Sequence, residues 1–412
     1  MRKKSNIETF SFLNVKFKDN KSTIINHIFY LISLSFFCKI LFTLLCIFIF
    51  GITIDYFDIR NYIAHGILVT SGNIPYISFT YEYGILSLIP MVISVIVSNI
   101  LNIQYAIPIF QLLMICCDII TVLCVYLITL KLYNEKLAYY AGLLYIISLS
   151  SLYTTITRYD ALPVCLLMLS ILLFIYHDSY KSYITTTIGF FTKVFPIITL
   201  PFFIIYDIKN NLFKIKNYVI PFIIFMICII PFIILGGLKT LNPYLFATGS
   251  SLKFEYVNTF GYTIYSWVHY VIGIDISYVS ITTMLSLIMV ISIGYILYYV
   301  YSLKQFGYKD MIKYIFISLC ILIICAKFHS PQYFMWITPM AVILSVDKIE
   351  KIFVFIIFQI ITFIEFPIMF GSFYTNIQYT NNIGNYGWYL TIFFFLIEYI
   401  ILIILIIMCI RE

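Results

Sequence analysis

The chain has 412 residues, of which 62% are hydrophobic and 10% charged. Soluble domains carry about 25% charged residues, so this composition excludes a soluble globular protein. The net charge of +7 comes from short basic clusters beside apolar runs, which indicates membrane topology rather than binding to nucleic acid. All ten cysteines lie within apolar runs, where we interpret them as packing residues and not as disulfide or zinc ligands.

Apolar runs recur along the whole chain. A helix needs about 20 apolar residues to cross the hydrocarbon, and it satisfies all its backbone hydrogen bonds there. We therefore predict an all-α, polytopic transmembrane helical bundle of about twelve spans. In chain order, the expected spans lie near 28–54, 83–100, 107–130, 138–156, 161–176, 183–206, 218–235, 277–301, 314–326, 333–346, 352–370 and 388–410, with a shorter aromatic stretch near 262–274.

The segment 1–26 is basic, and no small-residue cleavage site follows the first apolar run. We expect a cytoplasmic N-terminus and an uncleaved first span, followed by one membrane domain over 27–412. The C-terminus is expected on the same side, because the later basic segments alternate with outward loops. The inward segments are 207–216, 302–313 and 347–351, and the outward loops are 55–82, 236–260, 327–332 and 371–387.

One part of this topology conflicts with the charge bias, because strict alternation places the basic segment 131–136 outside. The conflict disappears if 83–100 is a re-entrant or interfacial helix and 183–206, which a lysine and two prolines interrupt, is a hairpin of two half-helices. We prefer this version. It also moves Arg158 and Asp160 to the outer face.

The first outward loop concentrates polar residues. Asp55 and Asp58 are spaced i, i+3, so on a short interfacial helix they share one face, with Tyr62 a further turn along. Two carboxylates at this place are candidates for a general base and for a substrate or metal ligand. The alternative is that Asp55 only caps the helix that follows.

Other polar side chains interrupt later apolar runs. Lys193 is costly inside its segment unless it reaches the interface, meets an anion or lines a wet cavity, and Lys39 raises the same question in the first span. Arg158 and Asp160 are expected to pair with each other. Aromatic side chains that are candidates for lining a sugar or prenyl groove are Tyr62, Tyr76, Tyr81 and Trp336.

The short loop before the span at 333–346 holds Lys327, His329 and Gln332. A lysine and an imidazole there are candidates for holding a lipid phosphate, with the amide of Gln332 as a hydrogen-bond donor. The alternative is an ordinary polar hairpin in which Lys327 reaches the interface and His329 is solvated.

The order of these features resembles the membrane glycosyltransferases of the GT-C superfamily. It is similar in particular to the polyprenol-phosphate-mannose-dependent mannosyltransferases, including the first mannosyltransferase of glycosylphosphatidylinositol assembly. The resemblance covers roughly residues 28–346. It rests on an outward Asp58 with Tyr62 four residues later, Gly72-Asn73-x-Pro75-Tyr76, Thr80-Tyr81-x-Tyr83, Arg158-x-Asp160, Thr192-Lys193-x-x-Pro196 and Lys327-x-His329-Ser330-x-Gln332-Tyr333.

The resemblance implies that an acidic residue of the first outward loop is the catalytic base. The best match is Asp58, with Asp55 second, although the spacing is Asp-x-x-Asp rather than Asp-x-Asp. Substrate-binding candidates are Tyr62, Arg158, Asp160, Lys193, Lys327, His329 and Gln332. No cofactor is assigned, and a divalent cation is left open.

The function expected from this resemblance is inverting transfer of a sugar, with mannose first among the candidates. The donor is a polyprenyl- or dolichyl-phosphate sugar and the acceptor is lipid-linked or on the outer surface. The expected location is the cell membrane, or the endoplasmic reticulum in a eukaryote. The alternative is a polytopic lipid or solute transporter or flippase, which would favour acids near the bilayer midplane.

Overall fold

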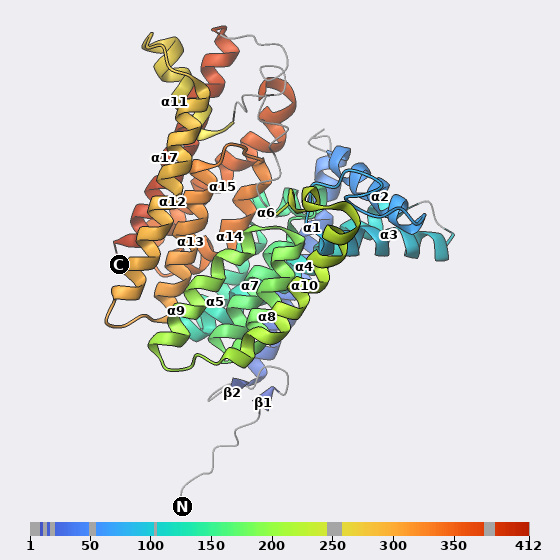
Figure 1. Ribbon diagram of the computed structural model, residues 1–412. Coiled ribbons are helices and arrows are strands. Elements are labelled where there is room, and N and C mark those ends of the chain that lie inside the picture. The colour runs from blue at the N-terminus through green and yellow to red at the C-terminus, as the bar shows by residue number, and fades with distance from the viewer. Residues whose placement is uncertain are drawn as a thin grey trace, which may run out of the picture.

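The computed structural model describes residues 9–10, 15–16, 21–48, 55–102, 105–244, 258–374 and 384–411. The chain forms a helical bundle (Figure 1), apart from one antiparallel pair of two-residue strands, β1 (Thr9–Phe10) and β2 (Val15–Lys16). Most of the basic segment 1–26 falls outside the described residues. The expectation of an all-α membrane protein with several spans is confirmed.

The N-terminal part of the bundle contains ten α-helices. They are α1 (Lys21–Phe48), α2 (Phe57–Thr70), α3 (Leu88–Ile100), α4 (Ala106–Leu132), α5 (Glu135–Ile146), α6 (Leu149–Thr157), α7 (Ala161–Ile175), α8 (Ser179–Thr192), α9 (Thr199–Lys209) and α10 (Val219–Gly236). Short 3-10 turns precede or follow some of them: η1 (Ile85–Ser87), η2 (Phe195–Ile198), η3 (Ile215–Tyr218) and η4 (Leu238–Leu241).

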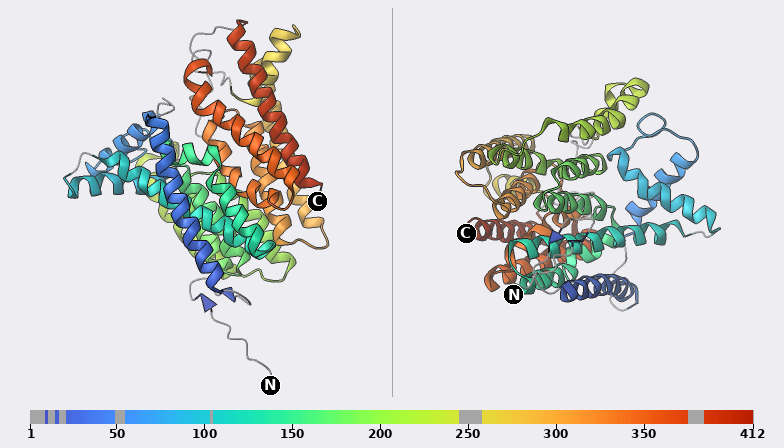
Figure 2. Two further views of the ribbon diagram at one scale, coloured as in Figure 1. Left: turned by 180° about the vertical axis from the view of Figure 1, so that it is seen from behind. Right: turned by 90° about the horizontal axis from the view of Figure 1, so that it is seen from below.

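The C-terminal part lies beside the first (Figures 1 and 2). It is built from α11 (Phe260–Ser266), α12 (Tyr278–Ser302), α13 (Tyr308–Cys325), α14 (Phe334–Ser345), α15 (Ile349–Phe363) and α17 (Tyr386–Ile410). It also contains the 3-10 turn η7 (Pro331–Tyr333) and two π-helical stretches, η6 (Trp267–Val271) and η8 (Ile364–Tyr374).

Six helices in the described ranges are long and apolar enough to cross a membrane, or seven if the bent pair α5–α6 counts as one span. They lie at Ser22–Cys46, Ala106–Leu132, Ile215–Gly236, Tyr278–Ser302, Ile349–Met369 and Tyr386–Ile410. The figure of twelve is therefore not confirmed by helix length and composition. The reason is physical: several apolar runs fold as short or broken helices, such as α7, α9 and α14, which have fewer than the about 20 residues of a continuous span.

The apolar run at 83–100 is not a long span. It forms η1 and α3. Helix α3 packs against α2, and α2 and α3 project to one side of the bundle (Figures 1 and 2). Gly66 permits this contact, because a Cβ there would lie 2.7 Å from the Met91 carbonyl oxygen. This agrees with the re-entrant or interfacial version of the topology.

The segment 183–206 is a helical hairpin. Helix α8 runs to Thr192, the chain turns at Lys193, and η2 and α9 run back alongside. Tyr183 near the start of α8 donates a 2.8 Å hydrogen bond to Asp207 near the end of α9. Pro196 near the start of η2 ends the first arm, because proline cannot continue its hydrogen bonding.

The basic segments gather at one end of the bundle. Lys131 lies over the Tyr176 ring, Tyr308 is 3.2 Å from the His177 Nδ1, and Lys309 is 3.6 Å from Asp347. The segment 131–136 therefore lies at the same end as 302–313. The topological conflict in the sequence is removed in this way.

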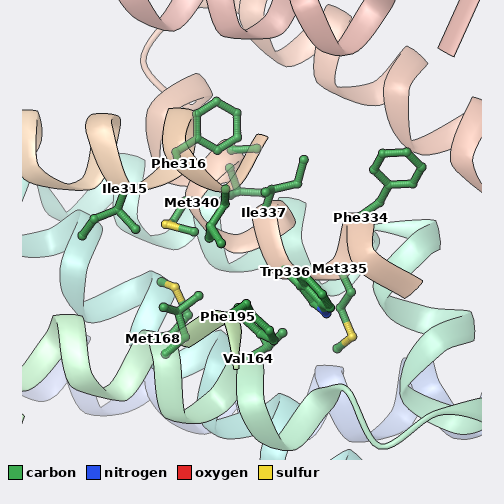
Figure 3. Packing of buried hydrophobic residues seen from close by; sticks show 14 of the residues in the cluster. Val164, Met168, Phe195, Ile315, Phe316, Phe334, Met335, Trp336, Ile337 and Met340 are labelled. Atoms are coloured by element: carbon green, nitrogen blue, oxygen red, sulfur yellow. The ribbon is translucent and has the colours of Figure 1, made fainter. Parts of the chain in front are cut away.

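A continuous core joins the two parts of the bundle. Phe195 of η2 stacks on Trp336 of α14 with ring centroids 4.1 Å apart, and Met168, Ile315 and Met340 pack nearby (Figure 3). These side chains come from η2, α7, α13 and α14, so the hairpin that carries Lys193 is held against the C-terminal helices.

The buried Lys39 in α1 has a partner that the sequence reading missed. Its Nζ lies 2.5 Å from Asp118 Oδ2 in α4, and both side chains are at most 1% exposed. Asp118 also accepts hydrogen bonds from Tyr145 (2.8 Å) and Ser151 (2.9 Å). Lys39 is thus explained as one half of a buried ion pair that joins α1 to α4 and, through Tyr145 and Ser151, to α5 and α6.

Candidate active site

Arg158 joins the two acids of the first loop. It caps the C-terminus of α6, where its Nη2 donates a 2.7 Å hydrogen bond to Asp55 Oδ2 and its Nε lies 2.8 Å from Asp58 Oδ2. The guanidinium is 4% exposed and each carboxylate 26%. One planar cation therefore fixes two carboxylates that remain accessible from outside. We call these three residues the Asp–Arg clamp.

Asp55 combines the two roles that the sequence left open. Its Oδ1 accepts a 3.0 Å hydrogen bond from the Phe57 backbone nitrogen at the start of α2, while Oδ2 binds Arg158. Its own backbone nitrogen donates to the Tyr153 hydroxyl at 3.2 Å. With its two oxygens engaged in this way, Asp55 serves as a helix cap and as part of the clamp.

The guanidinium of Arg158 is held on its remaining sides. Nη1 donates a 3.0 Å hydrogen bond to the Thr157 carbonyl oxygen, and the group lies 4.8 Å from the centre of the Phe366 ring. Burial alone would lower the pKa of Arg158, but the charges of Asp58 and Asp55 raise it. Arg158 thus stays a cation within an apolar surrounding.

Asp58 differs from Asp55 in its environment. Burial raises the pKa of the Asp58 carboxyl, Asp55 and Asp160 raise it further, and Arg158 and Lys193 oppose this shift. Within the part of the chain that the structure describes, its second oxygen accepts no hydrogen bond. Asp58 therefore has the higher proton affinity expected of a general base and a free lone pair to use.

A second charged pair lies close to the clamp. Asp160, at the start of α7, accepts 2.7 Å hydrogen bonds on Oδ1 from Lys193 and from the indole nitrogen of Trp336. The Lys193 ammonium also lies 5.0–5.3 Å from the ring centres of Tyr159, Tyr333 and Trp336. Cation–π contacts and one carboxylate thus hold the ammonium in place.

Arg158 and Asp160 do not pair with each other, so that expectation is wrong. The chain turns between α6 and α7, and the two side chains reach different partners: Arg158 meets the first-loop acids and Asp160 meets Lys193. Both nevertheless lie at the same end of the bundle as Asp58. The re-entrant version of the topology expected this shared face.

Tyr62 is 1% exposed and packs among other aromatic rings. Its ring packs edge-on against Tyr83 and Tyr159, with centroids 5.8 Å and 5.3 Å apart, and is tilted against Phe110. These rings form an apolar floor under the clamp. Of the other aromatic candidates, Tyr76 and Tyr81 pack together in the same loop, and Trp336 binds Asp160.

The later polar loop is only partly brought to this site. Lys327 is exposed, and its backbone oxygen accepts a 3.4 Å hydrogen bond from Tyr278. His329 is buried beside Tyr333 and faces Glu365, and Gln332 accepts a hydrogen bond from Ser330. In the described ranges none of the three contacts the clamp. Their role in donor binding stays a prediction.

Sequence reasoning missed three side chains of the site: Tyr153, Tyr159 and Phe366. A signal was present for two of them. Tyr153 lies in a run of serines and threonines inside an apolar segment, and Phe366 follows Glu365, an acid within an apolar run. Such polar interruptions of membrane segments indicate functional or tightly packed positions.

The described residues do not fit a metal site. They contain no group of three or more His, Cys, Asp or Glu residues that could hold a metal ion. The Oδ2 atoms of Asp55 and Asp58 are both engaged by Arg158. No step below is therefore routed through a metal.

Comparison with known proteins adds no assignment. No protein-family model, no curated protein and no solved structure matches the chain.

Proposed function

We propose that this protein is an inverting membrane glycosyltransferase that moves a sugar from a polyprenyl-phosphate donor to a lipid-linked or surface acceptor. Mannose is the expected sugar. The observation that carries the proposal is the Asp–Arg clamp: a partly exposed carboxylate on the short helix α2, held by a buried arginine beside a second carboxylate–ammonium pair.

In the proposed reaction, Asp58 removes the proton from an acceptor hydroxyl. The hydroxyl oxygen attacks the anomeric carbon as the bond from that carbon to the phosphate oxygen breaks, and the polyprenyl phosphate leaves with the electron pair. Attack and departure on opposite sides give inversion. No nucleotide is required.

Arg158 acts in this scheme as a positioning residue, because its side chain is only 4% exposed and three of its five donors face Asp55, Asp58 and the Thr157 carbonyl oxygen. Lys193 is the better candidate for binding the phosphate that leaves. Its ammonium has three donors, of which Asp160 takes one among the described residues, and it is 15% exposed. Asp160 and the aromatic rings keep it near Asp58.

The passage of the chain through the bundle supports a GT-C-like arrangement of about twelve crossings. Twelve passes follow if the short and broken helices are counted as α1, α4, α5–α6, α7, α8, η2–α9, α10, α12, α13, α14, α15 and α17. On this count α2 and α3 are the interfacial helices of the first outward loop. The clamp then lies at the opposite end from the basic segments.

We place the basic end in the cytoplasm, with both termini, and the clamp on the outer face of the cell membrane, or in the lumen of the endoplasmic reticulum in a eukaryote. The donor and the acceptor would both reach the clamp from the outer leaflet. Membrane lipid is a partner in this scheme, and nucleic acid is not.

A transporter or flippase is the second candidate. One observation favours it: Asp118 and Glu398 are buried inside candidate spans, so acids are not confined to the bundle ends. Asp118, however, is accounted for by Lys39. The partly exposed clamp at one end supports the transferase more directly.

The two candidates separate in one assay. The purified full-length protein is placed in proteoliposomes with labelled polyprenyl-phosphate mannose and a mixture of acceptor lipids. Label found in a new glycolipid, with release of polyprenyl phosphate, supports the transferase. Movement of intact donor between leaflets without cleavage supports the flippase and contradicts the proposal.

A further inference from the structure

A second polar cluster lies in the C-terminal helices, away from the clamp. It consists of Glu365 in η8, Glu398 in α17, Asn258 before α11 and His329 before η7, each at most 2% exposed. Asn258 donates a 3.1 Å hydrogen bond to Glu365 Oε1, and His329 Nε2 lies 3.9 Å from the same oxygen. We call these residues the Glu365 cluster.

Several atoms of the cluster lack the partners that burial demands. Glu365 Oε2, Glu398 Oε1 and both ring nitrogens of His329 are buried without a hydrogen-bond partner among the described residues. Glu398 lies beside the same segments, because its neighbour Tyr399 donates a 2.8 Å hydrogen bond to the Asn258 carbonyl oxygen and α17 packs against η8. Two ionised carboxylates in such a place are strongly unfavourable unless something neutralises them.

Among the residues that the structure describes, no lysine or arginine forms an ion pair with Glu365 or Glu398. Burial lowers the pKa of His329 to about 3, so its imidazole is neutral. Tyr399, next to Glu398, donates to the Asn258 carbonyl oxygen, and Tyr278 to that of Lys327. These hydroxyls are neutral. They supply hydrogen bonds rather than positive charge.

Arg158 lies over the ring of Phe366, but it forms its ion pairs with Asp55 and Asp58 of the clamp. No metal-binding group of three or more His, Cys, Asp or Glu residues occurs in the described ranges. The smallest remaining ligand that satisfies an unpartnered carboxylate oxygen is a proton.

We propose that Glu365 and Glu398 form a proton-binding site, in which one of the two buried carboxyls holds a proton and Asn258 and His329 are neutral neighbours. The proton comes from water and returns to water, so one carboxyl is neutral when the site is loaded and both are ionised when it is empty. This site goes beyond the transferase proposal and does not depend on it.

The position of the proton-binding site connects it to the Asp–Arg clamp. Glu365 is followed by Phe366, whose ring centre lies 4.8 Å from the Arg158 guanidinium. Loss of the proton adds a negative charge one residue away from the contact that supports the clamp. The proton-binding Glu365 is therefore next in sequence to Phe366, which contacts the arginine that holds Asp55 and Asp58.

Infrared spectroscopy of the full-length protein in lipid nanodiscs tests the site. A protonated carboxyl has a carbonyl stretch that is separate from that of a carboxylate and shifts in D₂O. The band is recorded at neutral pH for the wild type, for wild type with ¹³C-labelled glutamate, and for the isosteric variants Glu365→Gln and Glu398→Gln. The control is Glu350→Gln, an exposed acid in the first turn of α15.

We expect a protonated-glutamate band in the wild type that shifts with the ¹³C label. It should be lost or displaced in both cluster variants and unchanged in Glu350→Gln. Absence of the band in wild type overturns the proposal, and so does a band that both folded cluster variants retain unchanged. The labelled wild type shows that the band comes from a glutamate, and either folded cluster variant assigns it to the Glu365 cluster. A band that appears only after chelation would assign the site to a metal ion instead.

Discussion

At the scale of single residues, the central feature is that one arginine determines the state of two acids. Arg158 is buried while Asp55 and Asp58 are each 26% exposed. An arginine suits this place because its planar group presents donors in two directions, whereas a lysine ammonium is a point charge. The acids are held without being withdrawn from the surface.

Replacing Arg158 tests its role as a positioning residue. In Arg158→Gln, the carboxylates lose their common partner, and we expect the transfer rate to fall about 100-fold, as for misplacement of a catalytic group. Arg158→Lys should restore part of the rate, because it keeps the charge but not the bridge. The matched control is Arg60→Gln on the exposed face of α2, which should retain the wild-type rate.

The pH profile separates positioning from a purely structural role. Asp58 acts as a base only when ionised, so activity falls as the pH drops through its pKa, which lies above that of an ordinary aspartate. Arg158 lowers this pKa. In Arg158→Gln the acidic limb should therefore move to higher pH. An unchanged limb with a reduced rate would mean that Arg158 supports only the fold.

At the scale of helices, the Lys39–Asp118 pair joins α1 to α4. The sequence showed that Lys39 needs a partner but did not identify it, because the partner depends on which helices pack together. Asp118 lies in α4, a helix distant in sequence from Lys39, so the sequence alone did not indicate it as the partner. In the same way, the sequence placed Arg158 near Asp160, whereas the turn between α6 and α7 sends them to different neighbours.

Removing Lys39 tests this element. In Lys39→Met, Asp118 is left buried without a cation, and we expect the free energy of unfolding to fall by about 3–5 kcal/mol. The matched control is Lys181→Met, which removes an exposed ion pair with Asp178 and should cost about 0–1 kcal/mol. Reversible unfolding in detergent micelles measures both. Equal effects would show that the buried pair contributes no more than a surface pair.

At the scale of the whole molecule, composition was enough to predict a helical membrane protein. The charge bias was enough to identify 83–100 and 183–206 as segments that are not single continuous spans. The number of long spans was not predictable, because a hydropathy window does not distinguish a continuous helix from a short one such as α7 or a broken one such as η2–α9. The Glu365 cluster was missed for a related reason. Its members come from four separate segments, and only packing brings them together.

The proposed orientation is testable with single cysteines. Ser71→Cys lies beyond α2 at the clamp end, and Lys304→Cys follows α12 at the basic end; both positions are exposed. By the positive-inside rule, a membrane-impermeant maleimide should label the first in intact cells and the second only after permeabilisation. Wild type gives the background of the ten native cysteines. Labelling of both from the same side would contradict the orientation.

The central claim is that Asp58 is the catalytic base, and the most direct test is the transfer rate of Asp58→Asn in proteoliposomes with labelled polyprenyl-phosphate mannose. The control is Glu82→Gln, an exposed acid of the same loop that makes no ion pair among the described residues. With both proteins folded and membrane-inserted, we predict that Asp58→Asn reduces the rate by about 100-fold or more while Glu82→Gln retains it. Full activity of Asp58→Asn would contradict the account.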